Sequence, residues 1–218
     1  MALQDIEARI AAATAAAGRP AGAVTLIAVS KVQPHDRVRA VLGAGQRVFG
    51  ENRVQEAEER WPPFREAFPG VALHLVGPLQ TNKLARALDL FDAIHSLDRD
   101  RLARRLADAV QARGSCPSLF VQVNTGREAQ KAGLDPAALD GFLATCIGRD
   151  LPIDGLMAIP PAAADPVPHF ELLRDLAARH RLRGLSMGMS DDFEAAIACG
   201  ATHVRIGSAL FGERPKAP

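Results

Sequence analysis

Lys31 combines a reactive side chain with a position where α/β proteins place their chemistry. It ends the apolar run Thr25-Leu-Ile-Ala-Val-Ser30 and is soon followed by Pro34. A run of this length and composition predicts a buried strand of a parallel sheet, with Lys31 at its carboxyl end. A partly desolvated lysine there can lose its proton and form a Schiff base with a carbonyl ligand. The alternative is an ordinary surface charge at a strand end.

Two glycine-rich turns near the end of the chain suit the binding of an anion. They are Ser186-Met-Gly-Met-Ser-Asp-Asp192 and Arg205-Ile-Gly-Ser208. In many barrels the loops after the seventh and eighth strands bind phosphate through backbone N–H groups, and glycine lets the backbone approach the anion. Ser190 is also expected to cap the helix that follows the first turn.

Arg205 is a candidate for the interior of the fold. In the segment His203-Val-Arg-Ile206, alternation places Val204 and Ile206 on one face and Arg205 on the other. If the two apolar residues face outer helices, Arg205 points inward and needs an acceptor. That acceptor is either a ligand or a carboxylate such as Glu51.

Four further sets of polar residues have a possible structural role, and for Asn52 a role in ligand binding is the alternative. Asn52 follows the second predicted strand, where its amide either bonds a ligand oxygen or caps the next helix. Glu56 and Arg60 are expected to pair across one turn of that helix. His74 is interpreted as a core histidine and Lys131 as a solvated loop charge.

The scaffold must bring these distant segments to one end of the molecule. Strand-like segments alternate with helix-like ones and lie at 25–30, 47–50, 72–76, 93–96, 118–123, 153–158, 184–187 and 203–206. This α/β pattern predicts a single (β/α)8 TIM barrel with an extra N-terminal helix over 2–17, and an open doubly wound sheet is the alternative. No linker divides the chain, so one domain over 1–218 is expected.

The composition excludes several functional classes. The 218 residues are 48% hydrophobic and 23% charged, and the net charge of +1 gives no reason to expect nucleic acid or an anionic membrane as a partner. No apolar run approaches the ~20 residues that cross a bilayer. Asp5 and Glu7 stand where a signal peptide would be basic, and the three cysteines are odd in number and far apart. A cytoplasmic protein with reduced thiols and no metal site is therefore expected.

The reactive residues would converge on one barrel mouth. A lysine after the first strand, an arginine in the eighth and glycine turns after the seventh and eighth suit a phosphorylated carbonyl ligand. Pyridoxal 5′-phosphate offers an aldehyde for Lys31, a phosphate for the turns and a ring nitrogen for Arg205. A class I aldolase-type barrel would keep the phosphate loops, but it needs an acid/base beside Lys31 that the sequence does not identify.

Motifs along nearly the whole chain carry a family resemblance. They are Ala28-Val-Ser-Lys31, Phe49-Gly-Glu-Asn52, Val54-Gln-Glu56, His74-Leu-Val-Gly-Pro-Leu-Gln-Thr-Asn-Lys83, Gly155-Leu-Met-Ala-Ile-Pro160, Ser186-Met-Gly-Met-Ser-Asp-Asp192 and Val204-Arg-Ile-Gly-Ser-Ala-Leu-Phe-Gly212. With them the chain resembles the pyridoxal phosphate homeostasis protein family, also called the proline synthase co-transcribed bacterial homologue. That family's barrel is similar to the N-terminal domain of alanine racemase.

The resemblance implies a cofactor site. Pyridoxal phosphate would bind as an internal aldimine on Lys31, with Arg205 facing the ring nitrogen and Asn52 near the cofactor. The implied phosphate loops contain Ser186, Gly188, Met189, Ser190, Gly207 and Ser208. Arg53 and Gln33 depart from the family, in which many members carry tyrosine and some a second lysine, respectively, and both are expected to border the mouth. Lys131 is then a candidate for a transient second acceptor.

The family's implied role is to carry or regulate a cofactor. Its members buffer or deliver pyridoxal phosphate in vitamin B6 and amino-acid homeostasis, with apo-enzymes as possible acceptors. Alanine racemase takes a second acid/base from a tyrosine in a partner's second domain, whereas this chain has no tyrosine. We therefore expect a non-catalytic monomer, and a weakly active pyridoxal-phosphate-dependent racemase or lyase is the alternative.

Overall fold

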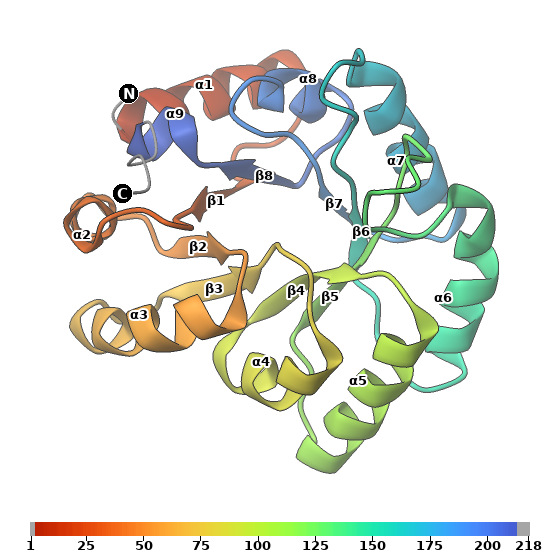
Figure 1. Cartoon of the computed structure of the whole chain (residues 1–218). Coiled ribbons are helices and arrows are strands. Elements are labelled where there is room, and N and C mark those ends of the chain that lie inside the picture. Colours follow the sequence, from red (N-terminus) through yellow and green to blue (C-terminus); the bar gives the residue numbers. More distant parts are fainter. Residues whose placement is uncertain (1–2, 213–218) are drawn as a thin grey trace.

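Eight parallel strands form a closed barrel in the computed structural model, which describes residues 3–212 (Figure 1). The strands follow one another in chain order, and the last pairs with the first from Thr25↔His203 to Ala28↔Ile206. The predicted (β/α)8 barrel is therefore confirmed. The doubly wound alternative is wrong, because an open sheet would leave its first and last strands as edges.

All eight predicted strands are present. They are β1 (Thr25–Val29), β2 (Val48–Glu51), β3 (Ala72–Leu75), β4 (Ala93–Leu97), β5 (Ser118–Gln122), β6 (Gly155–Met157), β7 (Gly184–Ser186) and β8 (His203–Ile206). Each strand is three to five residues long. The strands' carboxyl ends form one mouth, which sets the position of the site.

Helices surround the barrel on the outside (Figure 1). They are α1 (Leu3–Ala16), α2 (His35–Gly43), α3 (Val54–Ala67), α4 (Leu84–Leu90), α5 (Asp100–Arg113), α6 (Leu139–Ile147), α7 (Val167–Arg179), α8 (Phe193–Ala198) and α9 (Ser208–Phe211), with 3-10 turns η1 (Thr81–Lys83) and η2 (Pro136–Ala138). Within residues 3–212, none of the helices has the length and apolarity to cross a membrane. Residues 1, 2 and 213–218 of the predicted domain lie outside the described residues.

The extra N-terminal helix α1 packs beside α8 (Figure 1). Its buried residues are Leu3, Ile6, Ile10 and Thr14. They are three or four residues apart, as the 3.6-residue period of a helix requires. Arg9 joins the two helices, because its Nε donates to Glu194 at 2.7 Å and its guanidinium lies 4.5 Å from the Phe193 ring centre. The helix therefore covers the junction between the end and the beginning of the barrel.

The barrel interior contains an apolar and a polar cluster. Ile27, Val29 and Val76 form the apolar cluster, and Gly50 leaves room for it because a Cβ there would lie 2.9 Å from Ile27 Cγ2. The polar cluster consists of His74, His95, Ser186, His203 and Arg205, with the Phe120 ring among them. Barrel interiors are usually dominated by Val, Ile and Leu, so a polar cluster of this size needs a separate explanation.

Candidate functional site

A cavity of about 260 Å³ opens at the carboxyl ends of the strands. Its lining comes from the ends of β1, β3 and β8 and from the loops after β2, β6, β7 and β8. It consists of Val29, Lys31, Asn52, Val76, Ile159, Met189, Ser190, Asp191, Arg205, Gly207 and Ser208. The structure thus brings together seven of the nine predicted cofactor residues, and Ser186 and Gly188 do not line this mouth cavity.

Ser30, the residue just before Lys31, is held by three hydrogen bonds. Ser30 N donates to Gly50 O at 3.0 Å, and Ser30 Oγ donates to Glu51 at 2.7 Å. Arg60, on α3, donates to Ser30 O at 2.6 Å. These bonds tie the end of β1 to β2 and α3, so Lys31 enters the mouth cavity from a fixed backbone position.

Glu51 does not pair with Arg205, so that predicted alternative is wrong. The carboxylate of Glu51 is fully buried and accepts hydrogen bonds from Trp61 Nε1 at 3.1 Å and from Arg60 at 3.3 Å. Burial raises its pKa, and these donors and the charge of Arg60 oppose that shift. Glu51 therefore braces the strand end behind Lys31.

Asn52 faces the mouth cavity and does not cap a helix. The cap position of α3 is Arg53, which has no side-chain capping bond, so the helix-cap alternative for Asn52 is wrong. Arg53 instead pairs with Glu56 at 3.0 Å. The predicted pair between Glu56 and Arg60 is also wrong, because Arg60 reaches inward to Glu51.

Val32 follows Lys31 in a strained conformation. Its φ of 52° lies in the left-handed region, and its side chain is 54% exposed. Left-handed backbone costs a non-glycine residue about 1–2 kcal/mol, and a β-branched side chain is especially unfavourable there. Strain of this kind is often held at functional sites, and here it turns the chain sharply after Lys31.

Replacing Val32 with glycine is expected to raise the free energy of unfolding by about 1 kcal/mol, because strain is relieved and part of the gain is offset by chain entropy. Urea unfolding measures the difference. Arg127→Gly is the matched control, since Arg127 has a φ of 51° but is not β-branched. We expect a smaller gain there, and a Val32→Gly variant no more stable than wild type would contradict the strain.

Arg205 is a buried cation without a carboxylate at ion-pair distance among residues 3–212. It is 5% exposed and donates from Nη1 to Ser186 Oγ at 2.8 Å and from Nη2 to Ala158 O at 2.9 Å. Burial lowers its pKa to about 10, and the charge of Asp192 opposes that shift. Each terminal nitrogen carries a second N–H, so Arg205 can donate to an acceptor in the mouth cavity. Ser186 thus supports Arg205 from within the barrel.

The loops after β7 and β8 are tied together beside the mouth cavity. Ser208 Oγ donates to Ser190 Oγ at 3.2 Å, and Ala209 N donates to the same oxygen at 3.4 Å. The prediction that Ser190 caps the helix after its own turn is wrong, because the cap position of α8 is Asp192. Ser190 instead contacts the first turn of α9. Two hydroxyl groups and Gly207 therefore meet at one wall of the cavity.

Gly188 holds the first of these loops in a shape that other residues cannot take. Its φ is +91°, and a Cβ there would lie 2.6 Å from Ala196 Cβ and 3.0 Å from Phe193 Cα. Its carbonyl accepts from Arg205 N at 3.0 Å. The conformation of this glycine thus links the loop to the strand that carries Arg205.

Gly188→Ala is expected to lower the free energy of unfolding by about 2–4 kcal/mol, since backbone strain and a steric clash add. Thermal or urea unfolding gives the value. Gly200→Ala is the control, because Gly200 has a φ of +103° but its added Cβ would lie 3.6 Å from the nearest atom, Leu185 Cδ1. Equal losses in the two variants would contradict the predicted clash at Gly188.

The mouth cavity is not lined by Gln33 or Arg53, which depart from the family, or by Lys131, the predicted second acceptor. Gln33 is 4% exposed and accepts from Arg37 at 3.3 Å, so the expectation that it borders the mouth is wrong. Arg53 lines a neighbouring cavity of about 710 Å³ together with Asn52. Lys131 forms an ion pair with Glu128 at 2.6 Å and is one-third exposed.

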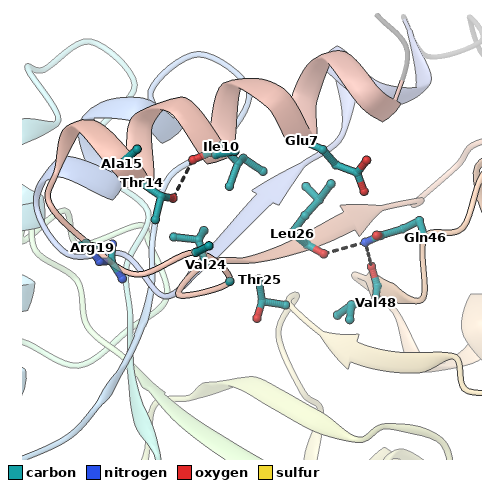
Figure 2. Close-up of a pocket in the computed structure, with 13 residues that line it drawn as sticks. Glu7, Ile10, Thr14, Ala15, Arg19, Val24, Thr25, Leu26, Gln46 and Val48 are labelled. Carbon is teal, nitrogen blue, oxygen red and sulfur yellow. Dashed lines mark hydrogen bonds between the residues drawn. The ribbon is translucent and has the colours of Figure 1, made fainter.

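A further cavity of about 430 Å³ lies between α1 and the beginnings of β1 and β2 (Figure 2). Figure 2 shows Glu7 and Gln46 at its edge, and the Gln46 amide donates to Leu26 O and Val48 O, both at 2.7 Å. None of the lysines in the described part of the chain lines this cavity. Its chemistry therefore differs from that of the mouth, and the predicted site residues do not belong to it.

Sequence reasoning assigned no role to His95 or His203. Both are in the barrel interior, and His95 is fully buried. The interpretation of His74 as a core histidine is confirmed, since it is 9% exposed and bonded to His95 at 3.1 Å. A signal was present, because His203 stands two residues before Arg205 and therefore shares its inward-facing parity.

Comparison with known proteins agrees with this geometry. The family model described as alanine racemase, N-terminal domain, matches residues 1–215. The pyridoxal phosphate homeostasis protein of Escherichia coli is 40% identical over 224 residues, which cover 97% of this chain and 95% of that protein. The protein of the same name from Pseudomonas aeruginosa is 43% identical over 219 residues, which cover 97% and 94%.

Solved structures give the same grouping. PipY of Synechococcus elongatus with pyridoxal phosphate bound has a TM-score of 0.81 and 40% identity, covering 93% of this chain and 100% of that one. Alanine racemase of Bartonella henselae, at 16% identity and a TM-score of 0.68, covers 96% of this chain but 61% of the racemase and shows the fold alone. The chain belongs to the pyridoxal phosphate homeostasis protein family.

Proposed function

We propose that this chain binds pyridoxal 5′-phosphate as a Schiff base on Lys31 and buffers or delivers it in vitamin B6 and amino-acid homeostasis. One observation carries the proposal. The mouth cavity places Lys31 with Arg205, a buried donor that has no carboxylate partner in the described part of the chain. A ligand with both a carbonyl group and an acceptor atom suits this pair.

The donor set of the mouth cavity fits the chemistry of this cofactor. When bound, pyridoxal phosphate supplies an aldehyde that a lysine amine can attack and a ring that can accept electrons. Arg205 is suited to donate a hydrogen bond to the ring nitrogen, because guanidinium offers donors only. Ser190, Ser208 and the backbone at Gly207 offer donors to the phosphate, and Asn52 offers an amide to the same cavity.

The same residues support a non-catalytic role. Arg205 cannot give up a proton to the ring nitrogen, so the ring remains a weaker electron sink than one paired with a carboxylic acid. The chain contains no tyrosine to act as a second acid/base. The loaded protein is therefore expected to racemise L-alanine no faster than free cofactor does, as followed by chiral chromatography. Faster racemisation would establish the racemase alternative.

The experiment that tests the proposal is an absorbance spectrum before and after borohydride reduction, followed by peptide mapping. The chain has four lysines, at positions 31, 83, 131 and 216, so the modified residue can be assigned without ambiguity. A visible absorbance band, together with a reduced adduct that maps to Lys31, supports the proposal. A protein that takes up no cofactor, or that carries it on another lysine, contradicts it.

We further propose that apo-enzymes dependent on pyridoxal phosphate receive the cofactor and that the carrier is a cytoplasmic monomer acting as one domain. Lys131 is the candidate second acceptor. Lys131→Ala is expected to slow transfer to an apo-enzyme a few-fold while leaving the occupancy of Lys31 unchanged. The measurement is the recovery of the apo-enzyme's activity with time, with Lys83→Ala as the control. An unchanged transfer rate would dispose of the role of Lys131.

A further inference from the structure

A continuous chain of hydrogen bonds runs from the mouth cavity into the barrel. Arg205 Nη1 donates to Ser186 Oγ at 2.8 Å, and Ser186 Oγ lies 2.8 Å from His95 Nδ1. His95 Nε2 lies 3.1 Å from His74 Nδ1. Ser186 and His95 are fully buried and connect β8, β7, β4 and β3, so this Arg205–His74 chain crosses the barrel interior.

The guanidinium fixes the direction of the first bond, and the directions of the other two follow if the Ser186 hydroxyl donates to His95. Arg205 can only donate, so Ser186 Oγ accepts from it and its hydroxyl hydrogen is available to His95 Nδ1. His95 is neutral, since burial and the neighbouring positive charges hold its pKa well below the ordinary value. With the Ser186 hydroxyl as donor, neutral His95 accepts at Nδ1 and carries its hydrogen on Nε2, from which it donates to His74 Nδ1.

The Arg205–His74 chain of hydrogen bonds is also held by contacts from the side. The His95 ring stacks on Phe120, with centroids 4.2 Å apart and planes 9° from parallel. The Arg205 guanidinium is fixed at its second terminal nitrogen by Ala158 O. The planes of the imidazole and the guanidinium are therefore both set by contacts within the barrel, independently of a ligand.

We propose that Ser186 and His95 are positioning residues for Arg205, which orient its guanidinium toward the ring of the bound cofactor. This inference rests on the proposed function. Without the Ser186 hydroxyl, Arg205 would keep Ala158 O as its anchor and could rotate about that bond. Without His95, the Ser186 hydroxyl would lose its acceptor and could turn toward other partners.

Two variants interrupt the Arg205–His74 chain of hydrogen bonds, and one preserves part of it. Ser186→Ala removes the hydroxyl, and His95→Phe removes both ring nitrogens while keeping a ring to stack on Phe120. His95→Asn keeps an acceptor near the position of Nδ1 and so serves as the conservative variant. His203→Phe is the matched control, because His203 is an interior histidine that bonds to Thr202 and to no member of the Arg205–His74 chain.

The measurements are cofactor affinity from absorbance titration and the visible absorbance maximum of the loaded protein. We expect Ser186→Ala and His95→Phe to weaken affinity about tenfold, as for the loss of one buried hydrogen bond to a charged group, and to shift the maximum. His95→Asn should restore most of both properties, and His203→Phe should leave both unchanged. Thermal unfolding of each cofactor-free variant confirms that it is folded.

A second measurement needs no cofactor. In nitrogen-15 NMR spectra of the cofactor-free protein, His95 Nδ1 should have the shift of an unprotonated nitrogen and Nε2 that of a protonated one. The opposite tautomer would overturn the inference, as would variants with wild-type affinity and absorbance maximum. A wild-type protein that takes up no cofactor would instead overturn the proposed function, which is thereby distinguished from failure of the positioning role alone.

Discussion

Lys31→Ala is expected to abolish covalent attachment of pyridoxal phosphate and the visible absorbance of the loaded protein, while the barrel stays folded. The loss is complete rather than partial, because among residues 3–212 no other lysine lines the mouth cavity. Folding should survive because the bonds that hold this strand end involve Ser30, Glu51 and Arg60 and not the lysine side chain. Lys31→Ala is thus expected to separate loss of the proposed Schiff base from loss of the fold.

The measurement is the visible spectrum of Lys31→Ala protein after incubation with cofactor, followed by borohydride reduction and mass spectrometry. Lys83→Ala is the control, since Lys83 lines the neighbouring cavity and should leave the adduct on Lys31 intact. Residual non-covalent binding is expected, because Arg205 and the loops beside Ser190 remain. An adduct that persists in Lys31→Ala would move the attachment site to another lysine.

The barrel and the composition of its mouth could be predicted from sequence because both depend on local patterns. Short apolar runs mark buried parallel strands, and the residue after such a run must lie at the mouth. Lys31 lies where its apolar run predicts, and Ser190 and Ser208 lie where the ordinal position of the glycine turns predicts. The inward direction of Arg205 followed from the parity of β8 alone.

Contacts that depend on strand stagger could not be predicted in the same way. Ser186 was assigned to a phosphate loop from its neighbours in sequence, yet it is the last residue of β7 and bonds to Arg205 and His95. Ser190 was expected to cap its own helix but contacts Ala209 in the next loop. Both outcomes depend on how adjacent strands are offset in a closed barrel, which no local pattern encodes.

The polar interior should make the stability of the barrel sensitive to acid. Burial lowers the pKa of His74 and of His203 to about 4 and that of His95 well below its ordinary value. The charge of Arg205 lowers the pKa of His95 and His203 further, while Asp154 opposes the shift of His203. These three histidines are therefore neutral in the folded protein under conditions in which an unfolded chain would protonate them.

The sign of the effect follows from linkage. Below pH ~6.5 the unfolded chain binds protons at these histidines and the folded chain does not, so unfolding becomes more favourable as the pH falls. Each histidine contributes a slope of up to about 1.4 kcal/mol per pH unit, which gives an upper value of about 6 kcal/mol for three histidines between pH 6.5 and 5. Glu51, whose pKa is raised, acts in the opposite direction and reduces the total.

Urea unfolding of the cofactor-free protein at pH 7, 6 and 5 measures this loss, which we expect to reach several kcal/mol by pH 5. His203→Phe should reduce the pH slope by about 1.4 kcal/mol per unit, because one titrating group is removed. Equal stability at pH 7 and pH 5 would mean that the folded barrel accepts these protons. Protonated His74 would then have to donate from Nδ1 toward His95, which reverses their hydrogen bond and disturbs the Arg205–His74 chain. The pH profile therefore reports on the hydrogen bonds of the Arg205–His74 chain.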